Sequence, residues 1–164
     1  MSEHPIAQII IDILAEKNSW YETFEHEPVR TSEDAARIRP DYSLEQGAKA
    51  IILRVKIPSI GKKFVMLVMP GNQKFDSSKI KLLLKSNNIR FATEDEVNTI
   101  TNGVKPGGVP PFGNLFDIEV VCDQKLFDNE KIIFNAGRNF SIAMMAVDYR
   151  ELVSPQIADI NAVA

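Results

Sequence analysis

Apolar and polar residues follow two different rhythms along the chain, and the first of them is helical. Five aliphatic residues between positions 6 and 14 recur at i, i+3, i+4, i+7 and i+8, which predicts a helix from about Pro5 to Lys17. The segment WYETFEHEP predicts a short strand that ends before Pro28. The segment TSEDAARI resembles a capping box and predicts a short helix that ends near Pro40.

A two-residue rhythm dominates the middle of the chain and predicts a β-hairpin. In AKAIILRVKIPSIGKKFVMLVMP, residues 48–70, two β-rich runs flank a Pro-Ser-Ile-Gly turn. Residues 77–93 predict an amphipathic helix, and residues 93–101 predict a further short helix that begins with acidic residues. LFDIEVVCD, KIIFNAG and FSIAMMAV are strand-like, and DYRELV begins a last helical turn. This mixture predicts an α+β fold with a mixed sheet.

Length and composition bound the class of protein. A chain of 164 residues fits one domain, 1–164, and is long enough to bury roughly 70% of its unfolded surface. The single cysteine excludes an internal disulfide and indicates a reducing compartment. No apolar run approaches the roughly 20 residues of a membrane helix, and the N-terminus lacks the layout of a secretion signal. We therefore expect a soluble, cytoplasmic protein with no membrane partner and an undefined oligomeric state.

The net charge of −3 conceals an uneven distribution. Residues 49–90 carry ten basic residues against Asp76 alone, a balance of +9. Residues 1–48 carry four basic against ten acidic residues and residues 91–164 carry five against eleven, so each flank has a balance of −6. The basic segment is either a phosphate-facing surface or the solvated side of a hairpin and a helix.

Lys49 is a candidate functional residue because of its place in the predicted hairpin. Strand alternation puts Lys49 on the same face as Ile51, Leu53 and Val55. An ammonium at the edge of an apolar face either extends to water or meets an anion, such as a phosphate or a polarised carbonyl.

The segment NGVKPGGVPPFGN, residues 102–114, has four glycines and three prolines within eleven positions. Such a segment is either a rigid crossover or a stiff loop whose N–H groups are preorganised toward an oxygen that gains negative charge. It lacks the Gly-Lys-Ser/Thr of a Walker loop and the strand and helix context of a Rossmann fingerprint.

Metal and nucleophile motifs are absent from the sequence. With two histidines and one cysteine, a zinc site could form only with carboxylates, so we expect no metal and no cofactor. Cys122 lies in an apolar run that is typical of packing. His26 precedes a strand end, where it either caps the strand or lines a pocket. Phe112 is either a base-stacking aromatic or a lid over the core.

Four motifs in order resemble those of the YbaK family, the aminoacyl-tRNA deacylases that include the editing insertion domain of bacterial prolyl-tRNA synthetase. They are HEPVRTSEDAA at 26–36, GAKAIILR at 47–54, GGVPPFG at 107–113 and FNAGRNFSIAM at 134–144. The resemblance covers most of the chain and implies a mixed, curved sheet flanked by helices. It also implies hydrolysis of the ester between a mischarged amino acid and the terminal adenosine of tRNA, with cysteine or alanine on tRNA(Pro) as the familiar substrates.

The resemblance also assigns roles to residues. The pocket lysine of the family maps onto Lys49, and its Gly-x-x-x-Pro loop maps onto Gly107 through Pro111, so Gly107 and Gly108 are expected to support the oxyanion. The expected substrate-binding residues are His26, Pro111, Phe112, Gly113, Asn135, Gly137 and Ser141. A tight hairpin turn is the alternative interpretation of residues 135–141, and we favour it for Arg138 and Asn139.

The resulting hypothesis is a free-standing trans-editing hydrolase that binds the tRNA acceptor end, with a prolyl-tRNA synthetase as a candidate docking partner. Because an aminoacyl ester is already activated, positioning and electrostatic stabilisation suffice, with water or a substrate group attacking. The alternative is a catalytically silent binding module of the same fold for an aminoacyl, nucleotide or protein partner. A metal-dependent hydrolase is disfavoured by the scarcity of ligands.

Overall fold

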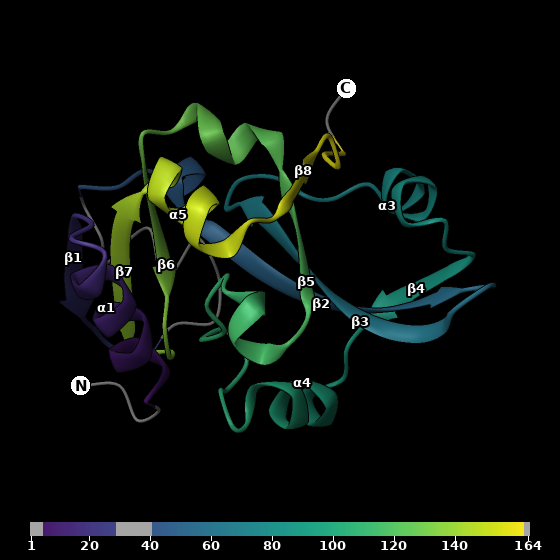
Figure 1. Ribbon diagram of the computed structural model, residues 1–164, viewed down its shortest axis with the longest axis horizontal. Coiled ribbons are helices and arrows are strands. Elements are labelled where there is room, and N and C mark those ends of the chain that lie inside the picture. Colours follow the sequence, from purple (N-terminus) through teal and green to yellow (C-terminus); the bar gives the residue numbers. More distant parts are fainter. Residues whose placement is uncertain (1–4, 29–40, 163–164) are drawn as a thin grey trace.

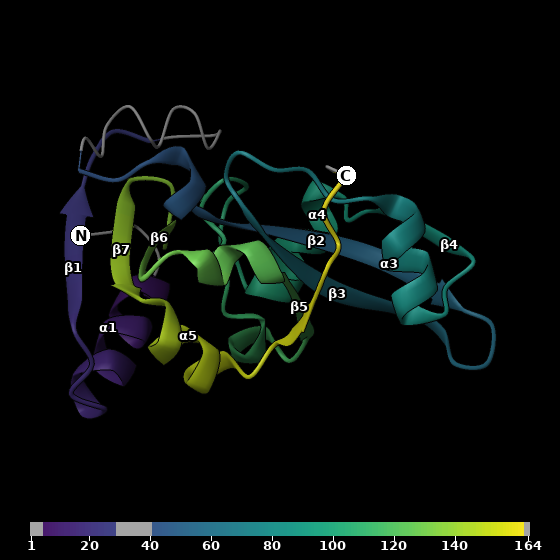
Figure 2. The same ribbon diagram turned by 90° about the horizontal axis from the view of Figure 1, so that it is seen from above.

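β-strands form the centre of the molecule. The computed structural model describes residues 5–28 and 41–162. A five-stranded sheet has the order β4-β2-β3-β5-β8, and a three-stranded sheet has the order β1-β7-β6. The strands are β1 (Tyr21–Glu25), β2 (Ala48–Ile57), β3 (Gly61–Pro70), β4 (Asn88–Phe91), β5 (Glu119–Asp123), β6 (Lys131–Asn135), β7 (Phe140–Met145) and β8 (Gln156–Ala158). Figures 1 and 2 show the smaller sheet at one end of the molecule and the tip of the β2–β3 hairpin at the other.

Antiparallel and parallel pairings are combined in the larger sheet. β2 pairs with β3 along its whole length and with β4 over its second half, both antiparallel, whereas β3–β5 and β5–β8 are parallel. The smaller sheet is antiparallel, with β7 between β1 and β6. One parallel bridge, Gly47 to Ile133, joins the two sheets. The predicted α+β class with mixed pairing is confirmed, and the strands divide into two linked sheets.

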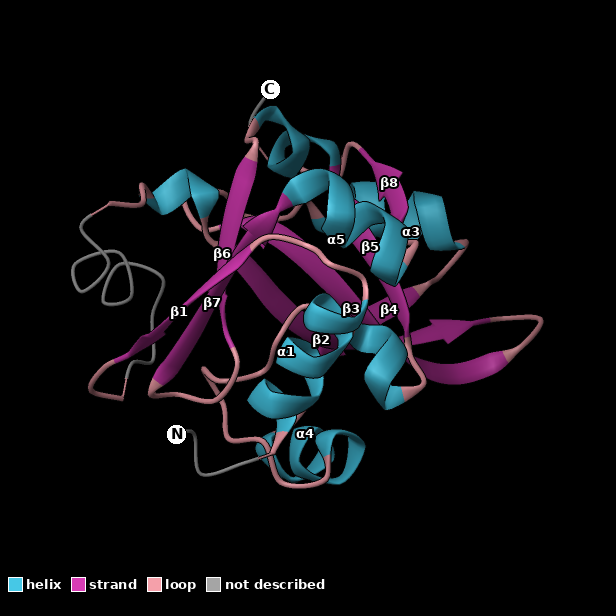
Figure 3. Ribbon diagram, turned by 60° about the vertical axis from the view of Figure 1, so that its left-hand side comes forward, coloured by secondary structure: helices cyan, strands magenta, loops and turns pink. Residues whose placement is uncertain are grey.

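Short helices cover both sheets (Figure 3). The α-helices are α1 (Ile6–Glu16), α3 (Ser77–Leu84), α4 (Glu94–Thr101) and α5 (Ala146–Val153), and the 3-10 helices are η1 (Leu44–Gln46), η2 (Gly113–Phe116) and η3 (Gln124–Asp128). The larger apolar core joins one face of β2 and β3, through Ile52 and Met66, to α1 and to β7. The opposite face of β2 packs with Ile80 of α3 in a second core.

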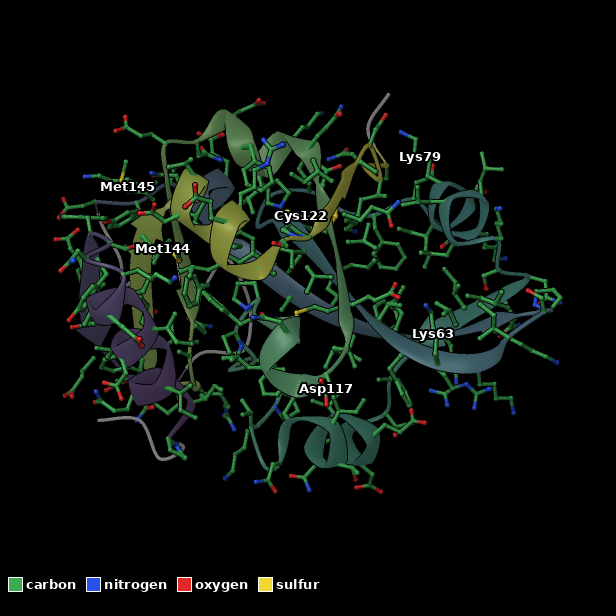
Figure 4. All side chains as sticks on the ribbon, viewed as in Figure 1. Lys63, Lys79, Asp117, Cys122, Met144 and Met145 are labelled. Atoms are coloured by element: carbon green, nitrogen blue, oxygen red, sulfur yellow. The ribbon has the colours of Figure 1, made fainter. Side chains whose placement is uncertain are left out.

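Alternation along β2 therefore follows the prediction. Leu53 and Val55 belong to the second core and Ile51 packs against it, so Lys49 starts the face that carries these residues. Two lysines outside β2, Lys63 of β3 and Lys79 of α3, are labelled in Figure 4. Lys63 forms a salt bridge with Glu119 of β5, and Lys79 forms one with Asp159 after β8.

The helix predicted over residues 77–93 is wrong in its second half. Lys85 adopts a left-handed conformation with φ 55°, and α3 ends at Leu84. The side chain of Ser86 then bonds the carbonyl oxygens of Lys56 and Asn88, which fixes the start of β4 against β2. The strand β8 was not predicted. The helix predicted for TSEDAARI lies outside the described residues.

Candidate functional site

The centre of the Gly/Pro loop is a tight turn from Lys105 to Gly108. The N–H of Gly108 donates to the carbonyl oxygen of Lys105 at 3.0 Å, and Gly107 has φ 86°. Proline at the second position and glycine with positive φ at the third are the requirements of a type II turn, which explains the Pro106–Gly107 pair. The turn is exposed at Gly107 and buried at Gly108.

Gly108 lies flat against the turn between β6 and β7. The N–H of Gly137 donates to the carbonyl oxygen of Gly108 at 2.7 Å. A Cβ atom at position 108 would lie 2.6 Å from the backbone nitrogen of Arg138 and 2.7 Å from the carbonyl carbon of Gly137. Because both contacts are with backbone atoms, only glycine allows the two turns to approach this closely.

A chain of hydrogen bonds connects the loop to β1. Asn135 Nδ2 donates to the carbonyl oxygen of Gly107 at 2.8 Å, and the Ser141 hydroxyl donates to Asn135 Oδ1 at 3.1 Å. His26 Nε2 lies 2.7 Å from Ser141 Oγ, and the backbone N–H of His26 donates to Asn139. The structure thus brings together five of the predicted residues: His26, Gly107, Asn135, Gly137 and Ser141.

The His26 ring makes a polar contact through each of its nitrogens. Its Nδ1 lies 2.8 Å from the carbonyl oxygen of Glu27, which can only accept. Asn135 Nδ2 faces the carbonyl of Gly107, so Asn135 Oδ1 must accept from the Ser141 hydroxyl. The donor and acceptor roles of the two His26 ring nitrogens in these contacts depend on the tautomer of the ring.

Lys49 is the second residue of β2, which follows the bridge from Gly47 to β6. Its side chain is partly buried, and Nζ donates to the carbonyl oxygen of Gln73 at 3.1 Å. Gly47 bridges Ile133 in parallel, so Lys49 and Asn135 each lie two residues beyond the bridge and on the same side of their strands. No hydrogen bond joins Lys49 to the Gly107–Gly108 turn among the described residues.

The second half of the loop is anchored in the core. Phe112 is 1% exposed, and its ring centroid lies 5.5 Å from that of Phe134 and 5.6 Å from that of Tyr149. The hydroxyl of Tyr149 donates to the carbonyl oxygen of Pro111. A Cβ at Gly113 would lie 2.6 Å from a methyl carbon of Val120, so this glycine also serves close packing.

Two predicted roles change with these positions. The ring of Phe112 is enclosed in the core, so it is not placed to stack on a base. The N–H of Gly108 is not available to a substrate oxygen, because it closes the turn on Lys105. The N–H of Gly107 makes no hydrogen bond within the described part of the chain, which leaves it as the donor that this turn presents.

The Cys122 thiol and possible metal ligands are the remaining candidate groups. Burial raises the pKa of the Cys122 thiol, and the neighbouring Asp123 carboxylate raises it further, so the thiol is neutral and packed. Within residues 5–28 and 41–162, no three His, Cys, Asp or Glu side chains are grouped so that they could hold a metal ion. In the same ranges, no helix combines the length and apolar character needed to cross a bilayer.

The fold and these motifs define an aminoacyl-tRNA editing domain. The model of that family matches residues 26–152, and the chain belongs to the family. The prolyl-tRNA editing protein ProX of Acetoanaerobium sticklandii is 27% identical over 150 residues, which cover 89% of this chain and 88% of ProX. The proline–tRNA ligase of Bordetella petrii is 31% identical over 122 residues, which cover 73% of this chain but only 21% of the ligase.

A solved structure has the same fold along the whole chain. It belongs to a protein proposed to be a trans-editing enzyme for prolyl tRNA synthetase, with a TM-score of 0.79 over 99% of this chain and 100% of that one. Its sequence identity of 21% is low, so the likeness extends to the fold alone.

Proposed function

We propose that this protein hydrolyses the ester of mischarged aminoacyl-tRNA as a trans-editing deacylase. The observation that carries the proposal is the Gly107–Gly108 turn, which Asn135 and Gly137 hold rigidly while the Gly107 N–H remains uncommitted. Because the chain belongs to the aminoacyl-tRNA editing family, we infer that the Gly107 N–H donates to the carbonyl oxygen of an aminoacyl ester. The names of ProX and of the proline–tRNA ligase support tRNA(Pro) as the carrier. Alanine and cysteine are the acyl groups that the resemblance to the family implies.

The geometry supplies electrostatic stabilisation without a covalent step. The Gly107 N–H donates to the carbonyl oxygen of the scissile ester as that oxygen gains charge, and a turn fixed at both ends needs no reorganisation during the reaction. Lys49 contributes a point charge from the start of β2. Water then attacks the ester carbon, and the ribose oxygen leaves as a hydroxyl.

The Ser141–His26 pair is better suited to positioning than to nucleophilic attack. Its 2.7 Å separation is that of a nucleophile and a base, but Ser141 is 0% exposed. The Ser141 hydroxyl is also committed to Asn135, which in turn holds Gly107. We therefore assign the pair to orienting Asn135, so that His26 stabilises the turn through two intervening side chains.

A basic face on the larger sheet is our candidate for contact with the tRNA backbone. Lys56 lies directly opposite Lys62 across β2–β3, and Arg54 lies opposite Arg90 across β2–β4, all four on one face. Like charges directly opposite each other destabilise a sheet. Glu96 neutralises Arg90, whereas Arg54, Lys56 and Lys62 make no salt bridge within the described residues. Phosphates would offset this repulsion.

The basic face and Lys49 are separated along β2. Seven residues from Lys49 to Lys56 span roughly 23 Å of strand, and alternation puts the two side chains on opposite faces. These cations therefore contact a part of the RNA other than the terminal adenosine. We include docking on a prolyl-tRNA synthetase in the proposal as a second source of affinity for the charged tRNA.

A catalytically silent binding module is the alternative function, and one experiment separates the two. Deacylation of a panel of mischarged tRNAs, including alanine and cysteine on tRNA(Pro), is followed by loss of the labelled ester. We expect release by the wild type, and a rate at least about 100-fold lower for Lys49→Ala at an unchanged melting temperature. Lys17→Ala removes an exposed lysine after α1 and serves as the matched control.

The outcomes of the panel are distinct. Binding of every charged tRNA without release supports the silent module. Full activity of Lys49→Ala refutes the assigned site, and loss of activity with a chelator refutes metal-independent hydrolysis.

A further inference from the structure

Arg138 lies beside the Gly107–Gly108 turn and has no electrostatic partner within residues 5–28 and 41–162. Its backbone nitrogen is the nearest atom to the vacant Cβ position of Gly108. Its side chain is partly buried, and Nε is buried with no hydrogen-bond partner. Among the described residues, Arg138 takes part in no salt bridge and no side-chain hydrogen bond. The arginine is therefore charged, partly desolvated and unpaired at the edge of the candidate site.

Such an arrangement is costly in the absence of a ligand. A guanidinium remains protonated at any physiological pH, so it cannot avoid the cost by losing its charge. Removing its Nε–H from water without a hydrogen bond adds a further desolvation penalty. Arginine side chains in this state pair bidentately with carboxylates or phosphates. The unsatisfied Nε thus indicates an anion that binds to the site.

The chemistry of the substrate class identifies this anion. In an aminoacyl-tRNA the carboxyl group of the amino acid is esterified and its amino group is neutral or positive. The phosphodiesters are therefore the only anions at the acceptor end. The phosphate on the 5′ side of the terminal adenosine is one ribose away from the ester. Arg138 is likewise close to the exposed Gly107, because its backbone nitrogen lies against Gly108, the next residue of the turn.

We propose that Arg138 binds a phosphodiester of the terminal nucleotides of the RNA and thereby sets the position of the ester over the Gly107 N–H. The assignment rests on the proposed function for the identity of the ligand. The backbone N–H of His26 donates to the carbonyl oxygen of Asn139, which holds the residue next to Arg138 in place. The positive charge of Arg138 favours an anion over the turn.

Binding of short RNA probes tests the assignment. The probes are a labelled, uncharged CpCpA trinucleotide and adenosine, which has no phosphate, titrated against wild type, Arg138→Ala, Arg138→Lys and the control Arg150→Ala. Arg150 is an exposed arginine in the last turn of α5. We expect Arg138→Ala to weaken trinucleotide binding about tenfold or more and to reduce the slope of log K against log salt by about 0.7. Arg138→Lys should recover the slope but only part of the affinity, because an ammonium lacks the bidentate fork.

The outcomes separate this assignment from the proposed function. Adenosine affinity and deacylation of an aminoacyl-adenosine should be unchanged in Arg138→Ala, whereas KM for aminoacyl-tRNA should rise. Equal losses for adenosine and the trinucleotide, an unchanged salt slope, or no trinucleotide binding by the wild type would each overturn the assignment. Arg138-dependent trinucleotide binding by a protein that deacylates no tRNA would refute the proposed function and leave the phosphate site intact.

Discussion

Substituting Gly108 with alanine should displace the Gly107–Gly108 turn from the turn between β6 and β7, against which it packs. The new methyl group would lie 2.6 Å from the Arg138 nitrogen and 2.7 Å from the Gly137 carbonyl carbon, and neither backbone atom can rotate away. The loop must move outward, which breaks the 2.7 Å bond from the Gly137 N–H and strains that from Asn135 to Gly107. Overpacking costs roughly 1–3 kcal/mol and each lost hydrogen bond roughly 0.5–1.5 kcal/mol. We expect unfolding free energy to fall by about 2–4 kcal/mol, or roughly 5–15 °C in Tm.

The Gly108→Ala substitution should impair the deacylation rate more strongly than it lowers the free energy of unfolding. A displacement of about 1 Å at Gly107 misaligns the donor and can cost on the order of 100-fold in rate. The assay combines urea unfolding with deacylation at a temperature where both proteins are folded. Gly61→Ala is the control, because Gly61 has φ 105° in the distal hairpin and no atom within 4 Å of its Cβ position, so it tests backbone strain alone. The reasoning fails if Gly108→Ala retains wild-type kcat/KM, or if its stability loss does not exceed that of Gly61→Ala.

Two further predictions concern the basic face and its ion pair. Lys56→Glu combined with Lys62→Glu should lower tRNA affinity and flatten its salt dependence while leaving hydrolysis of aminoacyl-adenosine unchanged; equal affinity in a filter-binding titration would exclude this face. The Arg90 guanidinium, with help from the Thr93 N–H, lowers the pKa of Glu96 from 4.5 to about 2. Because the pKa is lowered in the folded state, this stabilisation is present above about pH 4.5 and is lost as pH falls toward 2. The Tm difference between wild type and Glu96→Gln should shrink over that window, and a constant difference would contradict the assignment.

Local patterns sufficed for most of the elements. Alternation alone placed Lys49 on the face of β2 that carries Leu53 and Val55, because a strand buried on both faces leaves no freedom in register. The prediction that the helix continues past Leu84 was wrong for a local reason. Lys85 adopts a left-handed conformation, which is uncommon for lysine and so could not be predicted from the residue type. β8 was not predicted because it has only three residues and because it forms through its pairing with β5, which is distant in sequence.

The site depended on contacts that no local pattern contains. His26 and Ser141 are 115 residues apart in sequence, and their contact arises because β1 and β7 are neighbours in the smaller sheet. The Pro106–Gly107 pair did carry a turn signal, and with it the commitment of the Gly108 amide could have been foreseen. Arg138 was interpreted as part of a tight turn, which is correct for its backbone, but only the packing of a second turn reveals that its side chain is desolvated.

The anchoring of Pro111 and Phe112 has a consequence for the proposed deacylase. The Pro111 carbonyl oxygen accepts from Tyr149 and the Phe112 ring packs against Phe134 and Tyr149, so the backbone here cannot shift without disturbing the core. Under the proposed function, selection among acyl groups would work by fixed shape, and the half-buried Val109 is the side chain that a substitution could change without touching that anchor.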